Sequence, residues 1–210
     1  MLVCHPDDEV LGCGGVICKH VAEGDEVHVA VVSVASEPEW DLSYRNNKLK
    51  EQEQVDEYLG ITSRHHFNIP VLEMNTIPRG RFNYMISDYI NELQPDIVYT
   101  HWYKDLNEQH QLVGLAGVIG TRLPMQCKVL MFENESTRYS LEAFRPNYYV
   151  SLTSEYLNKK CNAFEFYKSE QKEAPHPRSI RGIWNQTFYR GHEVGLNYAE
   201  AFYLVRVVVK

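Results

Sequence analysis

Two groups of acids and histidines could carry chemistry in this sequence. The first directly follows a short apolar run and contains His5, Asp7, Asp8 and Glu9. Adjacent carboxylates repel one another, so this clustering suggests a positively charged partner such as a metal ion. The second group lies much further along the chain and ends at His110. A mononuclear zinc enzyme needs three nitrogen or oxygen ligands and one open position, and His5, Asp8 and His110 supply that set.

Asp7 is the candidate general base. Zinc lowers the pKa of a bound water to about 7, and Asp7 could take a proton from that water and later pass it to the leaving group. Asp8, as a ligand, would not share this role. The alternative is that the acids form a solvated turn and the histidines are scattered, and this alternative is stronger for His110 alone than for the first group.

The composition is that of a globular protein. A length of 210 residues fits one domain, residues 1–210, with 44% hydrophobic and 23% charged residues. The formal net charge of −7 argues against a nucleic-acid partner, which would call for a basic patch. Five cysteines without a C-x-x-C pair indicate reduced thiols, so we expect a cytoplasmic protein. We find neither a signal peptide nor a membrane span, and the sequence leaves open whether a homo-oligomer forms.

Strand and helix patterns alternate along the chain. Strands are expected at residues 2–4, 27–35, 65–69, 96–101, 129–132, 148–152 and 202–209. Helices are expected at residues 12–22, 42–59, 81–93, 112–123, 155–170 and 178–190. This alternation predicts an α/β fold with helices on both faces of a mostly parallel sheet. Both groups of acids and histidines follow strands, at the carboxyl ends where such sheets bind ligands. The first strand is so short that we expect its beginning to be missing.

Three motifs carry a resemblance to a known family. Residues 5–15 read His-Pro-Asp-Asp-Glu-Val-Leu-Gly-Cys-Gly-Gly and resemble the signature of the PIG-L/LmbE-like zinc-dependent N-deacetylases. Residues 105–110 resemble the second motif of that family, and residues 190–191 with 198–202 resemble its C-terminal ending. The resemblance implies a Rossmann-like fold in which zinc is bound by the three ligands named above and Asp7 is the base. It also implies a small-molecule substrate, an N-acetylglucosamine-type sugar or conjugate, that is hydrolysed to acetate and a free amine.

The second motif departs from the family in two places. Members usually have an aspartate directly before the histidine ligand, where it can orient the ring, but this chain has Gln109, with Asp105 at the start of the motif. Many members also place a histidine three residues before the ligand, where it can stabilise the oxyanion. Asn107 occupies that position and can donate through its amide. His101 or His192 could instead provide a positive charge, and His192 is favoured.

Candidate substrate contacts are less specific. The family often has an arginine on the helix after the second strand, and here Lys48 is the closest match by spacing, with Arg45 one turn earlier. A solvated helix face is an equally good explanation for both. His101 and Trp102 lie on the expected rim of the sheet and could line a sugar pocket, although aromatic residues there also serve as packing.

Two other functions compete with a deacetylase. A catalytically impaired protein that still binds metal and sugar is favoured by Gln109 and opposed by the retention of Asp7. A nucleotide-binding Rossmann module is opposed by the acidic loop, which would repel a pyrophosphate. The glycines of residues 12–15 do not fit G-x-G-x-x-G either, and we expect them to form a tight turn that lets a helix pack closely under the metal site.

Overall fold

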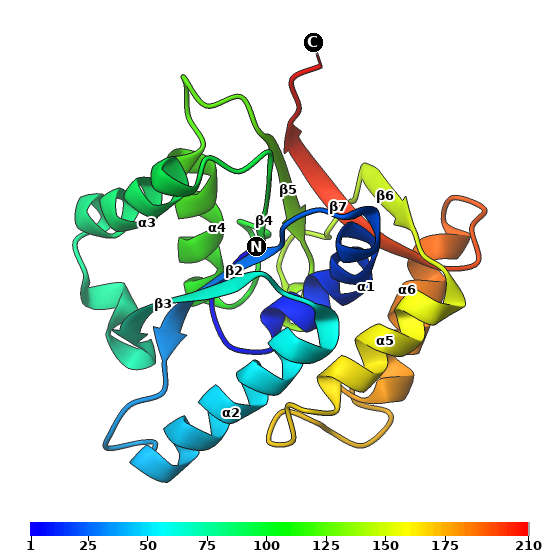
Figure 1. Ribbon diagram of the computed structural model, residues 1–210, viewed down its shortest axis with the longest axis horizontal. Coiled ribbons are helices and arrows are strands. Elements are labelled where there is room, and N and C mark those ends of the chain that lie inside the picture. Colours follow the sequence, from blue (N-terminus) through cyan, green and yellow to red (C-terminus); the bar gives the residue numbers. More distant parts are fainter. Residues whose placement is uncertain (210) are drawn as a thin grey trace.

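The computed structural model describes residues 1–209, with strands at the centre and helices around them (Figure 1). The strands are β1 (Leu2–Val3), β2 (His28–Val34), β3 (Ser63–Pro70), β4 (Ile97–His101), β5 (Lys128–Phe132), β6 (Tyr148–Ser151) and β7 (Ala199–Arg206). The α-helices are α1 (Asp8–Glu23), α2 (Leu42–Leu59), α3 (Arg79–Leu93), α4 (Glu108–Gly120), α5 (Ser154–Phe164) and α6 (Ile180–His192). Two short 3₁₀ helices are η1 (Val71–Thr76) and η2 (Ser136–Tyr139).

The strands form two sheets that meet at β1 and β4. One sheet has the order β1-β2-β3 and is entirely parallel. The other has the order β4-β5-β7-β6, in which β4 and β5 are parallel and β7 runs antiparallel to both of its neighbours. Contacts between β1 and β4 bring the two sheets side by side. The predicted α/β class is confirmed, and the antiparallel strand β7 between β5 and β6 is an addition that the alternating pattern did not predict.

The valine-rich strand β2 contributes apolar side chains to both faces of the sheet. Val29 and Val31 pack in the core that contains residues of α1 and α5. Ala30 and Val32 pack in the opposite core, with residues of α3 and α4. Successive side chains of a strand point to opposite faces, so a strand that is apolar at every position must be covered on both sides. This is why helices lie on both faces.

The glycines of residues 12–15 lie within α1 rather than in a turn, and they allow close packing. A Cβ atom on Gly15 would lie 2.3 Å from a methyl group of Leu152. The amides of Gly15 and Val16 donate to the carboxylate of Glu200 on β7, at 2.9 and 2.7 Å. That carboxylate also pairs with Lys160 at 2.6 Å. The glycines therefore bring the helix backbone against a buried carboxylate, which is incompatible with binding a phosphate there.

Three helix ends differ from the expectation in ways that matter for function. Helix α1 begins at Asp8 and α4 at Glu108, both earlier than expected, so acidic residues occupy their first turns. Carboxylates in a first turn are stabilised by the helix dipole, which offsets the low helix propensity of the glycines in α1. Helix α5 ends at Phe164, well before residue 170. The chain that follows, residues 165–179, is then free to reach the site described below.

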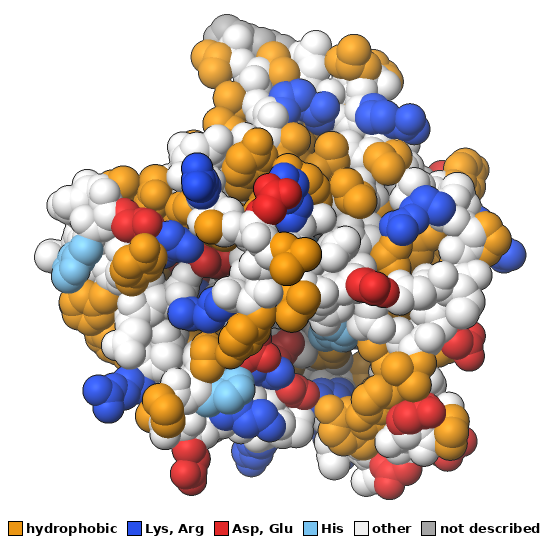
Figure 2. Space-filling model, turned by 180° about the vertical axis from the view of Figure 1, so that it is seen from behind, with side chains coloured by type: hydrophobic (Ala, Val, Ile, Leu, Met, Phe, Trp, Pro, Cys, Tyr) orange, Lys and Arg blue, Asp and Glu red, His pale blue; other side chains and the backbone are white. Residues whose placement is uncertain are grey.

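Charged side chains of both signs are interspersed on the face shown in Figure 2. Among residues 1–209, no helix combines the length and hydrophobicity needed to cross a membrane. The five cysteines are free thiols and all are buried.

Candidate functional site

The first group of residues sits where β1 leads into α1. Asp7 is the residue directly before the helix, with a φ of 112°, a left-handed conformation that is rare for a residue with a side chain. Its amide donates to Glu9 at 3.1 Å, and Glu9 is in turn paired with Arg64 at 3.0 Å. Backbone strain of this kind costs on the order of 1–3 kcal/mol and persists where the surroundings enforce it, often at functional sites.

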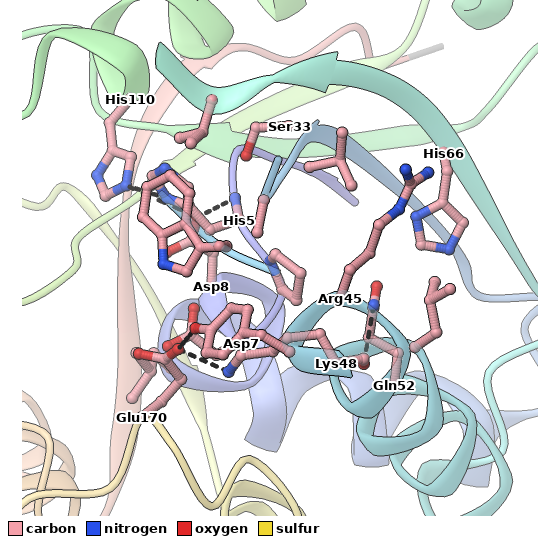
Figure 3. Close-up of a pocket in the computed structure, with 18 of the residues that line it drawn as sticks. His5, Asp7, Asp8, Ser33, Arg45, Lys48, Gln52, His66, His110 and Glu170 are labelled. Atoms are coloured by element: carbon pink, nitrogen blue, oxygen red, sulfur yellow. Dashed lines mark hydrogen bonds and ion pairs between the residues drawn. The ribbon is translucent and has the colours of Figure 1, made fainter. Parts of the chain in front are cut away.

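The second group reaches the same place from the end of β4. Asn107 precedes α4, and its side-chain oxygen accepts a hydrogen bond from the Gln109 amide at 2.9 Å. This cap begins the helix so that His110 falls in the first turn. His110 Nε2 lies 3.2 Å from His5 Nδ1 and 3.7 Å from Asp8 Oδ2, and His5 Nδ1 lies 3.4 Å from Asp8 Oδ2. Figure 3 shows the two imidazoles turned toward one another above Asp8.

These three atoms have the spacing of metal ligands. In a tetrahedral zinc site with bonds of about 2.0–2.2 Å, the ligand atoms lie roughly 3.3–3.6 Å apart. The observed separations of 3.2, 3.4 and 3.7 Å match this triangle. Asp8 and His110 are buried and His5 is partly exposed, so the set has an open side. Two nitrogen donors and one oxygen donor also suit zinc chemically.

Hydrogen bonds on the far side of each ring direct a lone pair toward this triangle. Gln109 Nε2 donates to the Val71 carbonyl at 2.6 Å, which orients the amide so that Oε1 accepts from His5 Nε2 at 2.9 Å. His5 Nδ1 is then unprotonated and available as a ligand. His110 Nδ1 lies 3.3 Å from Ser136 Oγ and 3.5 Å from Asp105 Oδ1, which leaves its Nε2 free.

Asp8 is held so that one oxygen faces the two imidazoles. Asn134 donates to Oδ1 at 2.5 Å, and the His5 amide donates to Oδ2 at 2.7 Å. Burial would raise the pKa of Asp8, but nearby His110 and His101 outweigh burial and hold that pKa well below its usual value. Asp8 therefore stays ionised, as a ligand must.

The pKa of Asp7 is shifted in the opposite direction to that of Asp8. Its side chain is 5% exposed, and Oδ2 lies 2.7 Å from Arg178 Nη2. Burial and the charge of Asp8 raise the pKa of Asp7 well above its usual value, and Arg178 opposes this shift only in part. Two neighbouring carboxyls with pKa values pushed in opposite directions are typical of a site in which one stays charged and the other exchanges a proton during the reaction.

A cavity of about 370 Å³ extends from this cluster, within the range of small-molecule sites. Its walls come from the start of α1, from α2, from β3 and from the two loops that follow β5 and α5. Figure 3 shows Arg45, Lys48 and Gln52 along α2 and His66 on the side of the cavity away from His110. Trp40 and Tyr44 add aromatic surface.

Comparisons with known proteins now bear on this geometry. The family model described as "PIG-L: GlcNAc-PI de-N-acetylase" matches residues 1–119, a range that contains His5, Asp7, Asp8 and His110. The chain belongs to the PIG-L family. The resemblance found in the sequence is thereby confirmed.

Similar proteins include one relative by sequence and two solved structures. The Escherichia coli K12 protein described as an uncharacterized deacetylase, YaiS, is 28% identical over 173 residues, which are 79% of this chain and 87% of YaiS. The N,N'-diacetylchitobiose deacetylase of Pyrococcus horikoshii has a TM-score of 0.76 at 19% identity, over 97% of this chain and 82% of that one. GalB, the 4-carboxy-2-hydroxymuconate hydratase of Pseudomonas putida KT2440, has a TM-score of 0.76 at 20% identity, over 100% and 98%. The identities of 19% and 20% to these two structures show a shared fold alone. The function of this chain must therefore be argued from its site.

The structure brings most of the predicted residues of this PIG-L chain together. Asn107, Lys48 and Arg45 line the cavity beside the candidate metal ligands and Asp7. Gln109 and Asp105 contact the ligand histidines, but Gln109 contacts His5 rather than its neighbour His110.

Three residues that were predicted to act on or to contact the substrate do not line the cavity. His101 is fully buried and stacks on His110 with ring centroids 4.1 Å apart. Burial, helped by His110, lowers the pKa of His101 to about 4, so this ring is neutral at pH 7 and provides no cation for an oxyanion. Trp102 is also buried, where it packs against Met131 and Phe144. His192 is exposed at the end of α6 against Phe188, away from the cavity.

The sequence reasoning missed the loop after β5 and the loop after α5. Asn134 and Ser136 contact Asp8 and His110, and Arg178 contacts Asp7. One signal for the first of these loops was present, because the polar run of residues 133–137 directly follows a predicted strand at the ligand-binding edge of the sheet. No comparable signal marks Arg178, which follows a proline-containing stretch.

Proposed function

We propose that this protein is a zinc-dependent hydrolase that removes the N-acetyl group from an N-acetylglucosamine-type sugar or conjugate. Acetate and a free amine are the products. The observation that carries this proposal is the convergence of His5, Asp8 and His110 beside Asp7 in the wall of a cavity. Membership in the PIG-L family and a relative described as a deacetylase support the same chemistry.

His5, Asp8 and His110 would hold the zinc ion. When bound, zinc supplies a Lewis acid for the acetamide carbonyl and lowers the pKa of a water molecule to about 7. The residues behind the ligands preserve this arrangement. Gln109 and Asp105 orient the two rings, and Asn134 occupies one oxygen of Asp8 so that the other faces the site.

Asp7 is the residue placed to move protons. It accepts one from the attacking water as the carbon–oxygen bond forms, and returns it to the nitrogen as the carbon–nitrogen bond breaks. Arg178 holds Oδ2 at 2.7 Å, and Oδ1 has no hydrogen-bond partner among residues 1–209. The raised pKa of Asp7 suits a group that must hold a proton between the two steps.

Asn107 is the candidate donor to the carbonyl oxygen. Its Oδ1 is committed to the Gln109 amide, so the side-chain Nδ2 is the part left to face the cavity. A neutral amide donor gives less electrostatic stabilisation than a cationic histidine would. Trp40 and Tyr44 provide aromatic surface for a sugar ring, and Lys48 and Arg45 provide polar contacts on the α2 wall.

Amine release tests the proposal. Purified protein is stripped of metal with a chelator, reloaded with zinc and assayed on N-acetylglucosamine conjugates. We expect release only from the reloaded protein, and a loss of roughly 10²- to 10⁴-fold in Asp7→Asn, the range for a general base. Asp88→Asn, an exposed acid on α3, is the matched control and should retain full activity. Equal release by wild type and Asp7→Asn would overturn the mechanism.

The competing function is a metal- and sugar-binding protein without turnover. Asn107 in place of histidine is the observation that favours it, because the site then lacks a cationic donor for the oxyanion. The same assay separates the two functions. Stoichiometric zinc together with binding of the sugar, but no amine release from any conjugate, would establish the binding protein instead.

A further inference from the structure

The α2 wall of the cavity presents three polar residues at helical spacing. Arg45, Lys48 and Gln52 follow one another at intervals of three and four, so they share one face of the helix. All three line the cavity. In Figure 3, Arg45 lies beside His66, on the side of the cavity away from His110. This end of the cavity is therefore remote from the acetamide position.

Arg45 differs from the two other cationic residues of the cavity wall. Lys48 pairs with Glu170 at 2.6 Å and with Glu51 at 3.3 Å. Arg178 pairs with Asp7 at 2.7 Å, and also with Glu170. Arg45, by contrast, has no carboxylate within ion-pair distance in the described part of the chain, residues 1–209. Among the described residues of the cavity wall, Arg45 is thus the one cation whose charge is not balanced by a carboxylate.

A residue of strand β3, Asn68, orients the Arg45 side chain. Asn68 has a φ of 55° and donates from Nδ2 to the His66 carbonyl at 3.1 Å, which turns its Oδ1 toward Arg45. Arg45 Nη2 donates to that oxygen at 3.3 Å. This is the only hydrogen bond that the Arg45 side chain makes to residues 1–209, out of five donors on a guanidinium. The remaining donors are available to a ligand.

His66 adds a second polar group at the same end. It lies two residues before Asn68 on β3, and both residues line the cavity. Burial, together with Arg64, lowers the pKa of His66, so the ring is neutral at pH 7 and can donate one hydrogen bond.

We propose that Arg45 and His66 form a subsite for an anionic group, a carboxylate or a phosphate, on the part of the substrate remote from the acetamide. The guanidinium fork matches the geometry of both groups and binds them with paired hydrogen bonds. This inference rests on the proposed deacetylase function and narrows its substrate class from amino-sugar conjugates in general to acidic ones. Lys48, already neutralised by two carboxylates, belongs to the wall rather than to this subsite.

Matched substrates test the subsite. N-acetylglucosamine 1-phosphate, N-acetylglucosamine 6-phosphate and the carboxymethyl glycoside are compared with the neutral methyl glycoside, using zinc-loaded enzyme. We expect at least one acidic compound to be preferred by roughly 10- to 100-fold in kcat/KM, mainly through KM, which is the range for hydrogen bonds to a charged partner. The phosphate and carboxylate arms identify which anion is bound.

Arg45→Gln should abolish that preference, so that the acidic and the neutral glycosides have the same kcat/KM within a few fold of one another. Lys50→Gln removes the same charge from an exposed position on α2 and should keep the preference. Turnover of the neutral glycoside as efficient as that of every acidic one would overturn the subsite while leaving the deacetylase intact.

Binding of the products gives a readout that needs no turnover. In calorimetric titrations, glucosamine 1-phosphate or 6-phosphate should bind wild type more tightly than methyl glucosaminide, and Arg45→Gln should remove the difference. Equal binding of acidic and neutral amines would refute the subsite. Tight binding of the acidic amines without amine release from any conjugate would instead refute the deacetylase.

Discussion

Replacing Gln109 with methionine should weaken zinc binding. The side chain connects the metal site to η1, because its Oε1 accepts from His5 Nε2 at 2.9 Å and its Nε2 donates to the Val71 carbonyl at 2.6 Å. Methionine has a similar length but provides neither hydrogen bond. His5 would then lose the partner that selects its tautomer and holds its ring.

The size of the effect follows from the group left unpaired. A partly buried N–H without a partner costs about 1–3 kcal/mol, which corresponds to roughly 5- to 150-fold in an equilibrium constant. Residues that orient metal-bound histidines typically change affinity by about 10- to 100-fold. We therefore expect the zinc dissociation constant of Gln109→Met to rise by about 10- to 100-fold.

A carboxylate at the same position should bring no improvement. In Gln109→Glu a charged carboxylate would accept the hydrogen bond from His5. A hydrogen bond to a charged acceptor is stronger than a neutral one by about 0.5–2 kcal/mol. The second carboxylate oxygen would face the Val71 carbonyl, however, so the existing hydrogen bond is replaced by two opposed acceptors. Leaving those acceptors unpaired costs about 1–3 kcal/mol, which equals or exceeds the gain. The variant should bind zinc no more tightly than wild type.

Competition with a chromophoric chelator measures these dissociation constants. Gln54→Met, at an exposed position on α2, is the control for the substitution itself. Thermal unfolding of the metal-free proteins checks that the fold is retained. Wild-type affinity in Gln109→Met, or zinc binding more than tenfold tighter in Gln109→Glu, would refute the reasoning.

Three further predictions concern the residues around the ligands. Asn134→Ala should raise the zinc dissociation constant by about 10- to 100-fold in the same competition, because Asp8 loses its partner on Oδ1. Arg178→Ala should lower kcat on the order of 100-fold with little change in KM, since Asp7 is no longer held in place, and Arg178→Lys should restore part of kcat. His101 has a pKa of about 4 in the folded protein against 6.5 ordinarily, so the unfolded chain binds more protons between these values. Stability of the metal-free protein should fall as the pH drops from 6.5 to 4, by up to about 3 kcal/mol, and urea unfolding of His101→Gln should show a shallower fall.

The fold class and the location of the site could be predicted from the sequence. Hydrophobic periodicity marked most strands and helices, and α2 begins and ends at the expected residues 42 and 59. The rule that ligands bind at the carboxyl ends of parallel strands placed His5 and His110 at one edge, and the structure brings them to 3.2 Å. That a single domain spans residues 1–210 stays a prediction.

The partners of these residues could not be predicted, because they depend on packing between distant segments. Gln109 directly precedes His110, yet neighbouring helix residues point about 100° apart, so Gln109 faces His5 instead. Trp102 follows β4 at the expected rim but turns into the apolar cluster with Phe144. Position along the chain identifies the edge of a sheet, whereas the direction of each side chain is decided by what packs around it.

The adjacent acids Asp7 and Asp8 illustrate how one short motif supports two roles. Asp8 lies inside the first turn of α1 and meets Asn134 and the imidazoles, all of which stabilise a charged carboxylate. Asp7 lies just outside the helix with a left-handed backbone, and there Arg178 and His5 oppose burial and the charge of Asp8 only in part, so that the pKa of Asp7 is raised. The two surroundings therefore distinguish the proposed metal ligand from the proposed proton carrier, although both residues have the same side chain.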